Sequence, residues 1–213
     1  AHRALAADMF EMPYDDVPKD DMDAQGLHSL RYIAKRCRHG LNYRMQVDRL
    51  AEVTGLPMAK AQDAFQRYHR TTPELRKWWH EVEQEVRTNR CLYNAFGRRF
   101  LIMGKIVDEE QLTPIIAFKP QSTIGDKVSM VMYQAQEDSK WPMQARILVN
   151  RHDSLTALAP VASALTCLSI MTRYAEEPII VRGEPMIIPA EGKIAKLGED
   201  GIRRLSSMEK VKL

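Results

Sequence analysis

Four residues at intervals of four, Arg31, Lys35, His39 and Tyr43, form the most chemically suggestive pattern in the sequence. On an α-helix this spacing drifts by about 40° per step, so the four side chains lie within an arc of roughly 120°. Cations at one end of such a stripe suit phosphates, and rings at the other end suit a sugar and a base. The stripe favours binding of a nucleoside triphosphate. The alternative is a solvated basic helix face with the tyrosine in the core.

A second candidate is the pair His152-Asp153, which lies between the short apolar runs 146–150 and 155–158. This pattern predicts a hairpin, whose turn would hold the carboxylate rigidly enough to bind Mg²⁺. The alternative is a turn aspartate that bonds its own backbone. The aspartate pairs between residues 15 and 21 lie among prolines and a lysine, so we interpret them as a solvated loop rather than a metal site.

These residues need elements to position them, and the pattern changes near Arg90 from helical to mixed. Before it we expect only helices, and after it short strands alternate with helices, which indicates an α+β fold. The predicted domains are residues 1–89 and 90–213. The expected helices cover 1–11, one or two within 25–54, 58–69, 73–88, 115–137 and 160–176; the expected strands lie within 91–100, 146–150, 155–158, 179–181 and 186–188.

Composition narrows the function classes. The 213 residues are 45% hydrophobic and 28% charged, which is typical of a globular protein with a real core. No run of about 18 apolar residues and no secretory leader occurs, so we expect a cytoplasmic protein without a membrane partner. The three scattered cysteines predict reduced thiols and no zinc site. A switch from an acidic stretch (8–23) to a basic one (31–49) favours an anion-facing helix.

Taken in order, the motifs resemble those of family A DNA polymerases, particularly phage-type members, over their C-terminal fingers and palm part. Residues 31–43 resemble motif B, and 149–155 resemble motif C. The other matching segments are His2-Arg3 with Ala4, Ala6 and Ala7, which resembles the segment that follows motif A; Phe96-Gly97-Arg98-Arg99; and Pro120-Gln121-Ser122-Thr123 with Asp126. The resemblance implies a helical fingers subdomain followed by part of a palm with an antiparallel sheet.

The resemblance also implies an activity: template-directed deoxynucleotidyl transfer to a primer by a two-metal mechanism, in DNA replication. The implied partners are primer–template DNA and a dNTP, and the implied cofactors are two Mg²⁺ ions. Arg31 and Lys35 would neutralise the triphosphate, with Lys35 also placed to protonate the leaving pyrophosphate. The implied contacts are Asp153 to metal; His39 and Tyr43 to sugar and base; Gln121, His152, Arg98 and Arg99 to DNA.

Several positions depart from the family pattern. His39 stands where the family has an aromatic residue, Arg44 where a glycine usually follows the motif B tyrosine, and Ser154 where motif C commonly has glutamate. Ala117 replaces the family's asparagine, and the tail after Gly198 has no counterpart.

The aspartate of motif A is also absent, so we expect the chain to be inactive alone. It would need an N-terminal portion carrying that carboxylate, in the same chain or in a split polymerase. The alternatives are a helix-turn-helix DNA-binding protein built around residues 50–65 and a polymerase-derived subunit that has lost catalysis.

Overall fold

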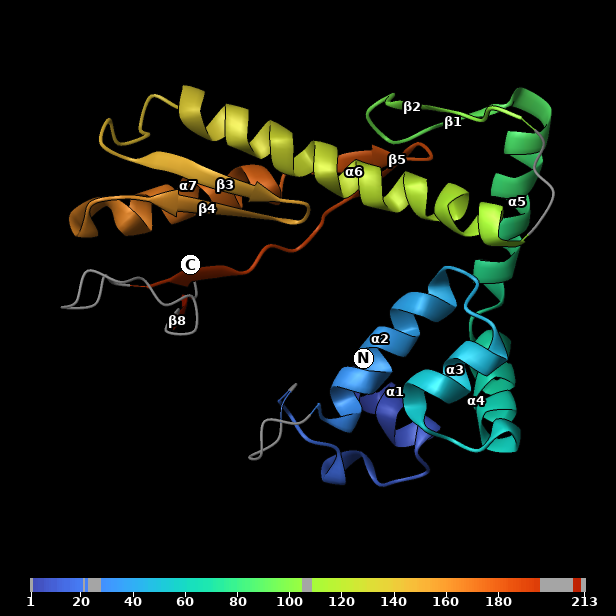
Figure 1. Cartoon of the computed structure of the whole chain (residues 1–213). Coiled ribbons are helices and arrows are strands. Elements are labelled where there is room, and N and C mark those ends of the chain that lie inside the picture. The colour runs from blue at the N-terminus through green and yellow to red at the C-terminus, as the bar shows by residue number, and fades with distance from the viewer. Residues whose placement is uncertain (1, 21, 23–27, 105–108, 196–208, 212–213) are drawn as a thin grey trace. The chain divides into compact units, whose positions relative to one another are not determined.

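The structure is a computed structural model, shown in Figure 1. Some predicted features lie outside the described residues. They are Asp21, the helix start at Gln25 and most of the tail after Gly198. Within the part that is described, no helix is both long and apolar enough to cross a membrane. The structure describes residues 2–20, 22, 28–104, 109–195 and 209–211, with the side chains of 109, 110 and 209–211 excepted.

The chain divides into two compact units. Unit 1 comprises Ala1–Leu92 and Leu101–Ala117, and unit 2 comprises Tyr93–Phe100 and Phe118–Leu213. Unit 1 is helical, as its sequence pattern predicts. Its elements are α1 (His2–Met9), the short 3-10 helix η1 (Tyr14–Asp16), α2 (Leu30–Asn42), α3 (Val47–Thr54), α4 (Met58–Thr71) and α5 (Pro73–Asn89).

Local sequence signals set the helix ends in unit 1. Ser29 is the N-cap of α2, and its hydroxyl accepts a hydrogen bond of 3.3 Å from the backbone N–H of Tyr32. Gly55 ends α3 in the left-handed conformation, with φ of 70°, which a residue without Cβ adopts at little cost. Pro73 occupies the first turn of α5, where the N–H it lacks has no helical partner.

The core of unit 1 joins α1, α2, α3 and α4. Ala6 of α1 and Ala34 of α2 are fully buried, and these small side chains allow the two helices to approach closely. Cys37, Leu41 and Leu50 extend the same core. Burial raises the pKa of the Cys37 thiol to about 11, so this cysteine is protonated at neutral pH. One face of α2 is thereby fixed inward, and the stripe of the predicted site lies on the other.

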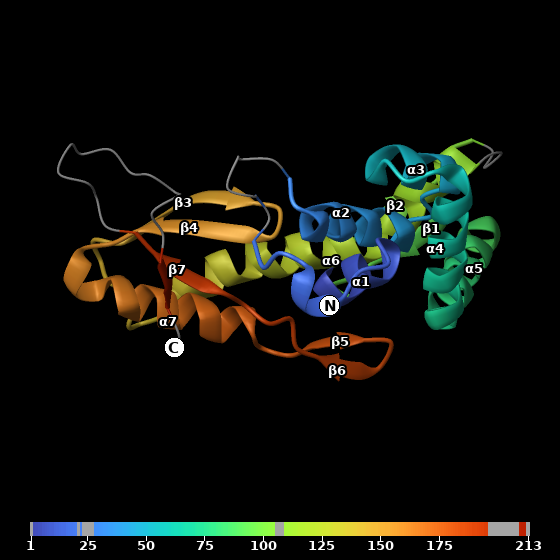
Figure 2. The ribbon, with the colours of Figure 1, turned by 90° about the horizontal axis from the view of Figure 1, so that it is seen from below.

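Unit 2 combines helices with two-stranded ladders, and the α+β fold class is confirmed. Figure 2 shows the β3–β4 hairpin along the helices of this unit, and β5–β6 as a separate hairpin after α7. The elements after α5 are β1 (Cys91–Tyr93), β2 (Arg99–Leu101), α6 (Glu109–Glu137), β3 (Arg146–Arg151), β4 (Ser154–Leu158), the 3-10 helix η2 (Val161–Ser163), α7 (Ala164–Ala175), β5 (Ile179–Val181), β6 (Glu184–Met186), β7 (Gly192–Ile194) and β8 (Glu209–Val211).

Several boundaries differ from the sequence prediction, two of them at prolines or turns. The expected start of a helix at Ile115 was wrong, because α6 begins before Pro114 and continues through Pro120. Leu112 on the far side of that proline is only 3% exposed, and tertiary burial of this kind offsets a lost helical hydrogen bond. The strand predicted over 186–188 is β6, which begins at Glu184 and ends at Met186, since a tight turn places Val181 opposite Glu184.

Candidate nucleotide-binding and DNA-binding surfaces

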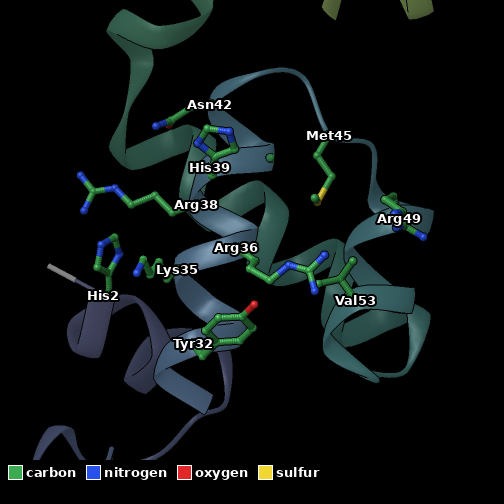
Figure 3. A pocket seen from close by; sticks show the side chains of 11 residues that line it. His2, Tyr32, Lys35, Arg36, Arg38, His39, Asn42, Met45, Arg49 and Val53 are labelled. Carbon is green, nitrogen blue, oxygen red and sulfur yellow. The ribbon is translucent and has the colours of Figure 1, made fainter. Parts of the chain in front are cut away.

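The solvent-facing side of α2 borders a hollow of about 670 Å³ within unit 1 (Figure 3). Residues of α1, α2 and α3 contribute to its wall. Tyr32, Lys35, Arg36, Arg38, His39, Gly40 and Asn42 come from α2, His2 from α1, Arg49 and Val53 from α3, and Met45 from the turn between α2 and α3. A volume of this size is in the range that holds a small organic ligand.

The wall of this hollow is strongly cationic. Lys35, Arg36, Arg38 and Arg49 all border it, and none of the lining residues found in the described part of the chain is acidic. Burial lowers the pKa of His2 below 6.5, and the neighbouring Arg38, Arg31 and Lys35 lower it further because they disfavour a second positive charge. Such a concentration of like charge attracts a polyanion.

The predicted stripe lies where its spacing places it. Ala34, Cys37 and Leu41 are buried on one side of α2, while Lys35 and His39 border the hollow on the other. Tyr43, the C-cap of α2, meets the His39 ring edge-on with centroids 4.9 Å apart. Arg31 lies in the first turn of the same helix. The helix and its amphipathic pattern are confirmed, whereas the binding roles stay predictions.

The end of α2 has a defined capping geometry. The backbone N–H of Met45 donates to the Gly40 carbonyl at 2.9 Å, which is the six-residue bond of a Schellman motif. Arg44 has φ of 68°, the left-handed conformation that the family's usual glycine adopts easily. The thioether end of Met45 lies 2.0 Å from where Gly40 would carry a Cβ. The backbone around Tyr43 is therefore tightly specified.

Sequence reasoning assigned no ligand role to several residues of this hollow. His2 and Arg49 come from α1 and α3, so only the tertiary fold brings them to α2. Arg36 and Arg38 lie outside the four-residue stripe but border the same hollow. For Arg36, Arg38 and Arg49, the run of positive charge between residues 31 and 49 was the signal in the sequence.

In unit 2, the predicted hairpin around Asp153 forms. β3 and β4 pair antiparallel, with Arg151 opposite Ser154, so His152 and Asp153 make the turn. His152 has φ of 41°, a left-handed conformation that suits tight hairpin turns. Both turn side chains are exposed. A carboxylate is thus presented at the tip of a short hairpin.

Asp153 offers a hard oxygen donor of the type that Mg²⁺ prefers. Among the residues that the structure describes, no group of three or more histidine, cysteine, aspartate or glutamate side chains is arranged to hold a metal ion. The metal-binding role of Asp153 therefore stays a prediction.

A polar cluster fixes the turn between β1 and β2 to α6. The Asn94 amide nitrogen donates to a carboxylate oxygen of Asp126 at 2.6 Å, and the Arg98 guanidinium contacts both oxygens of that carboxylate. The amide oxygen of Asn94 accepts from the backbone N–H groups of Phe96 and Arg98. Hydrogen bonds from Arg98, and then from Asn94, lower the pKa of Asp126 below 3.8. This cluster is structural support, and nothing in the sequence beyond the motif residues themselves pointed to it.

The remaining predicted DNA contacts are also in unit 2. Gln121 is exposed on α6, Arg99 is exposed on β2, and Arg98 keeps 60% of its side chain exposed despite its ion pair. The structure therefore divides the predicted site residues between the two units. The nucleotide-binding set belongs to unit 1, and the metal-binding and DNA-binding set belongs to unit 2.

The helix-turn-helix alternative meets a structural objection. α3 and α4 do form adjacent helices, but two cations of the would-be recognition helix α4 face carboxylates. Lys60 contacts Glu11 at 2.6 Å, and Arg67 contacts Asp63 at 2.5 Å. A recognition helix needs such side chains directed at DNA instead.

Comparison with known proteins decides the family. The profile described as DNA polymerase family A matches residues 1–181. This chain belongs to that family. It is 27% identical over 190 residues to the thermostable DNA polymerase I of Thermus aquaticus, covering 86% of this chain and 21% of the relative. It is 25% identical over 186 residues to DNA polymerase I of Treponema pallidum, covering 84% of this chain and 18% of the relative. The family A chain thus spans about a fifth of these curated relatives.

A solved structure shares the fold of this family A chain. It is the POL domain of Pol1 from M. smegmatis, in complex with a DNA primer-template and dNTP. The TM-score is 0.66 at 19% identity, and the match covers 81% of this chain and 30% of that chain. This likeness confirms the α+β architecture that the motifs implied, and the family profile confirms the recognition of the family from those motifs.

Proposed function

We propose that this family A chain forms the nucleotide-binding fingers part and a portion of the palm of a DNA-directed DNA polymerase. The observation that carries the proposal is the hollow beside α2, where the motif B residues Lys35 and His39 meet further cations and no lining residue described is acidic. A triphosphate carries the negative charge that such a surface attracts. The proposed domains remain a helical part, 1–89, and a palm part, 90–213.

In this proposal each end of α2 meets a different part of the dNTP. Arg31 and Lys35 neutralise the phosphates, and Lys35 holds a proton near the leaving pyrophosphate. His39 and Tyr43, which already contact each other, meet the sugar and the base at the other end. Gln121, His152, Arg98 and Arg99 contact the primer–template, with Gln121 suited to minor-groove acceptors.

The proposed chemistry involves two Mg²⁺ ions, which supply charge neutralisation for phosphoryl transfer when bound. Asp153 contributes one oxygen ligand from the hairpin tip. In our proposal the further carboxylate comes from the polypeptide portion that carries motif A, in the same or a separate chain. Nucleotide binding by α2 and metal binding by Asp153 are therefore separable properties of this chain.

The nucleotide site is tested by titrating the chain with dATP in a calorimeter. Loss of one charged hydrogen-bond donor in Lys35→Ala should weaken binding about 10- to 100-fold. The matched control is Lys60→Ala, which removes an exposed lysine that pairs with Glu11 and does not border the hollow. Equal affinity of Lys35→Ala and the unmodified chain would contradict the proposal.

The catalytic role is tested by primer extension with a polypeptide that carries the motif A segment added. Extension should occur, and Asp153→Asn should abolish it without changing dATP affinity. Nucleotide binding without any extension would indicate the alternative of a polymerase-derived subunit that has lost catalysis. Sequence-specific duplex binding that Lys35→Ala does not alter would instead indicate the helix-turn-helix alternative.

A further inference from the structure

The residue after the motif B tyrosine makes two side-chain contacts with α5. The Arg44 guanidinium lies 3.4 Å from a Glu83 carboxylate oxygen, and the two side chains are only 18% and 25% exposed. Its central carbon lies 5.7 Å from the centroid of the Trp79 ring, within cation–π range. Both contacts are made by a residue in the left-handed conformation, which is unfavourable for a side chain with a Cβ. Partners on α5 therefore hold Arg44 in this position.

The residue before the motif B tyrosine is held in the same way. The indole N–H of Trp79 donates to the backbone carbonyl of Asn42 at 2.9 Å, which satisfies a carbonyl of the last turn of α2. The hydroxyl of Tyr68 on α4 donates to the Asn42 side-chain oxygen at 2.6 Å. We call this group the α2 anchor, and it consists of Asn42, Arg44, Tyr68, Trp79 and Glu83.

Tyr43 lies between the two anchored residues, and its ring contacts His39. We propose that the α2 anchor positions Tyr43 and His39 for the sugar and base of a dNTP, with Arg44 as a positioning residue. This inference rests on the proposed nucleotide site. It adds that the residues positioning the sugar and base differ from those that bind the phosphates. Lys35 is nine residues before Arg44, roughly 13 Å along a helix, so we expect loss of the Arg44 side chain to leave the phosphate contacts unchanged.

The test compares two ligands of the same hollow. Arg44→Gly removes the side chain, and glycine tolerates the left-handed backbone, so the change isolates the anchor. Calorimetry on the full chain should show dATP binding weakened about fivefold, the scale of one partly buried ion pair. Affinity for inorganic tripolyphosphate, which has neither sugar nor base, should stay unchanged. General loss of structure would weaken both ligands alike.

The matched control is Arg87→Ala. Arg87 pairs with the same Glu83 carboxylate at 2.8 Å, yet it belongs to α5 and makes none of the described contacts with α2. It should leave dATP affinity unchanged. Glu83→Gln keeps Arg44 over Trp79 while weakening the ion pair, so it should shift dATP affinity in the same direction as Arg44→Gly and by less.

The outcomes separate this inference from the proposed function. Unchanged dATP affinity in Arg44→Gly, or an equal loss for both ligands, would overturn the anchor proposal. If Arg44→Gly fails to fold, Glu83→Gln decides by the same comparison of dATP with tripolyphosphate. An unmodified chain that binds neither ligand would refute the nucleotide site itself.

Discussion

Two groups of cations, one in each unit, differ in the partners that surround them. In unit 1, Lys35, Arg36, Arg38 and Arg49 border one hollow whose described lining includes no carboxylate. In unit 2, arginines meet aspartates inside the unit: Arg98 contacts Asp126, and Arg173 contacts Asp138, which also accepts a hydrogen bond from Tyr174.

In our proposal, this difference separates charges that serve binding from charges that serve folding. Like charges around a hollow repel one another, which favours binding of an anion, although Arg49 also pairs with Glu52 at 2.5 Å. Paired charges with additional hydrogen bonds stabilise the fold and fix a turn or a helix end. Buried or paired polar groups and exposed charges should therefore fail in different assays, and three predictions follow that contrast from the largest effect to the smallest.

Asp126→Ala should be the most disruptive. It removes the carboxylate that Arg98 and the buried Asn94 share, so one N–H of the Asn94 amide loses its acceptor while the other keeps Ser122. The free energy of unfolding should fall by about 2–3 kcal/mol, measured by urea denaturation. Asp153→Ala, which alters an exposed aspartate of the same unit, should change it by less than about 0.5 kcal/mol. Equal effects of the two substitutions on the free energy of unfolding would contradict the structural role of Asp126.

His69 should make the stability of unit 1 sensitive to acid. The ring is 3% exposed among Phe65, Tyr68 and Trp79, and neither nitrogen has a hydrogen-bond partner among the residues described. Burial, and then the charge of Arg76, lowers its pKa below 6.5. The neutral form is favoured in the folded state, so this contribution to stability is complete above pH 6.5 and is lost as the pH falls through the lowered value.

His69→Phe keeps a ring in place and removes both nitrogens. The free energy of unfolding of the variant, measured by urea denaturation, should exceed that of the unmodified chain by about 1 kcal/mol. This difference should be larger at pH 5 than at pH 7. Parallel pH profiles for the two proteins would show that His69 is not the acid-sensitive group.

Arg99→Ala should have the smallest effect, and only on binding. Its exposed side chain should contribute one phosphate contact, so affinity for primer–template DNA should fall about threefold and the salt dependence should decrease slightly. Unfolding should be unchanged. Arg98→Ala, in contrast, should lower stability because it breaks the pair with Asp126. A stability loss in Arg99→Ala would place it with the structural arginines.

The sequence predicted those features that depend on nearby residues. The four-residue spacing from Arg31 to Tyr43 gave the exposed face of α2, because helical periodicity alone determines which side chains align. The apolar runs around His152 and Asp153 gave the hairpin for the same reason. Proline misled the prediction at Pro114, where burial of Leu112 outweighs the local signal.

Features that depend on distant residues escaped prediction. Arg44 was recognised only as a departure from the family pattern, since its partner Glu83 is 39 residues away in the chain. The Asp126 cluster likewise joins residues 28 and 32 apart. Neither periodicity nor composition reports such pairings. A site of this kind is thus visible from its motifs, whereas the contacts that hold it in place require the fold.

The burial of cysteine gives the chain a practical property. The thiolate form of cysteine reacts with alkylating reagents. Cys37 and Cys167 are both buried, and burial raises the pKa of each thiol. Cys91, at the start of β1, is the partly exposed one of the three. A maleimide dye should therefore attach at a single sulfur, and a fluorophore there would report on the region beside the Asn94 turn without any engineered mutation.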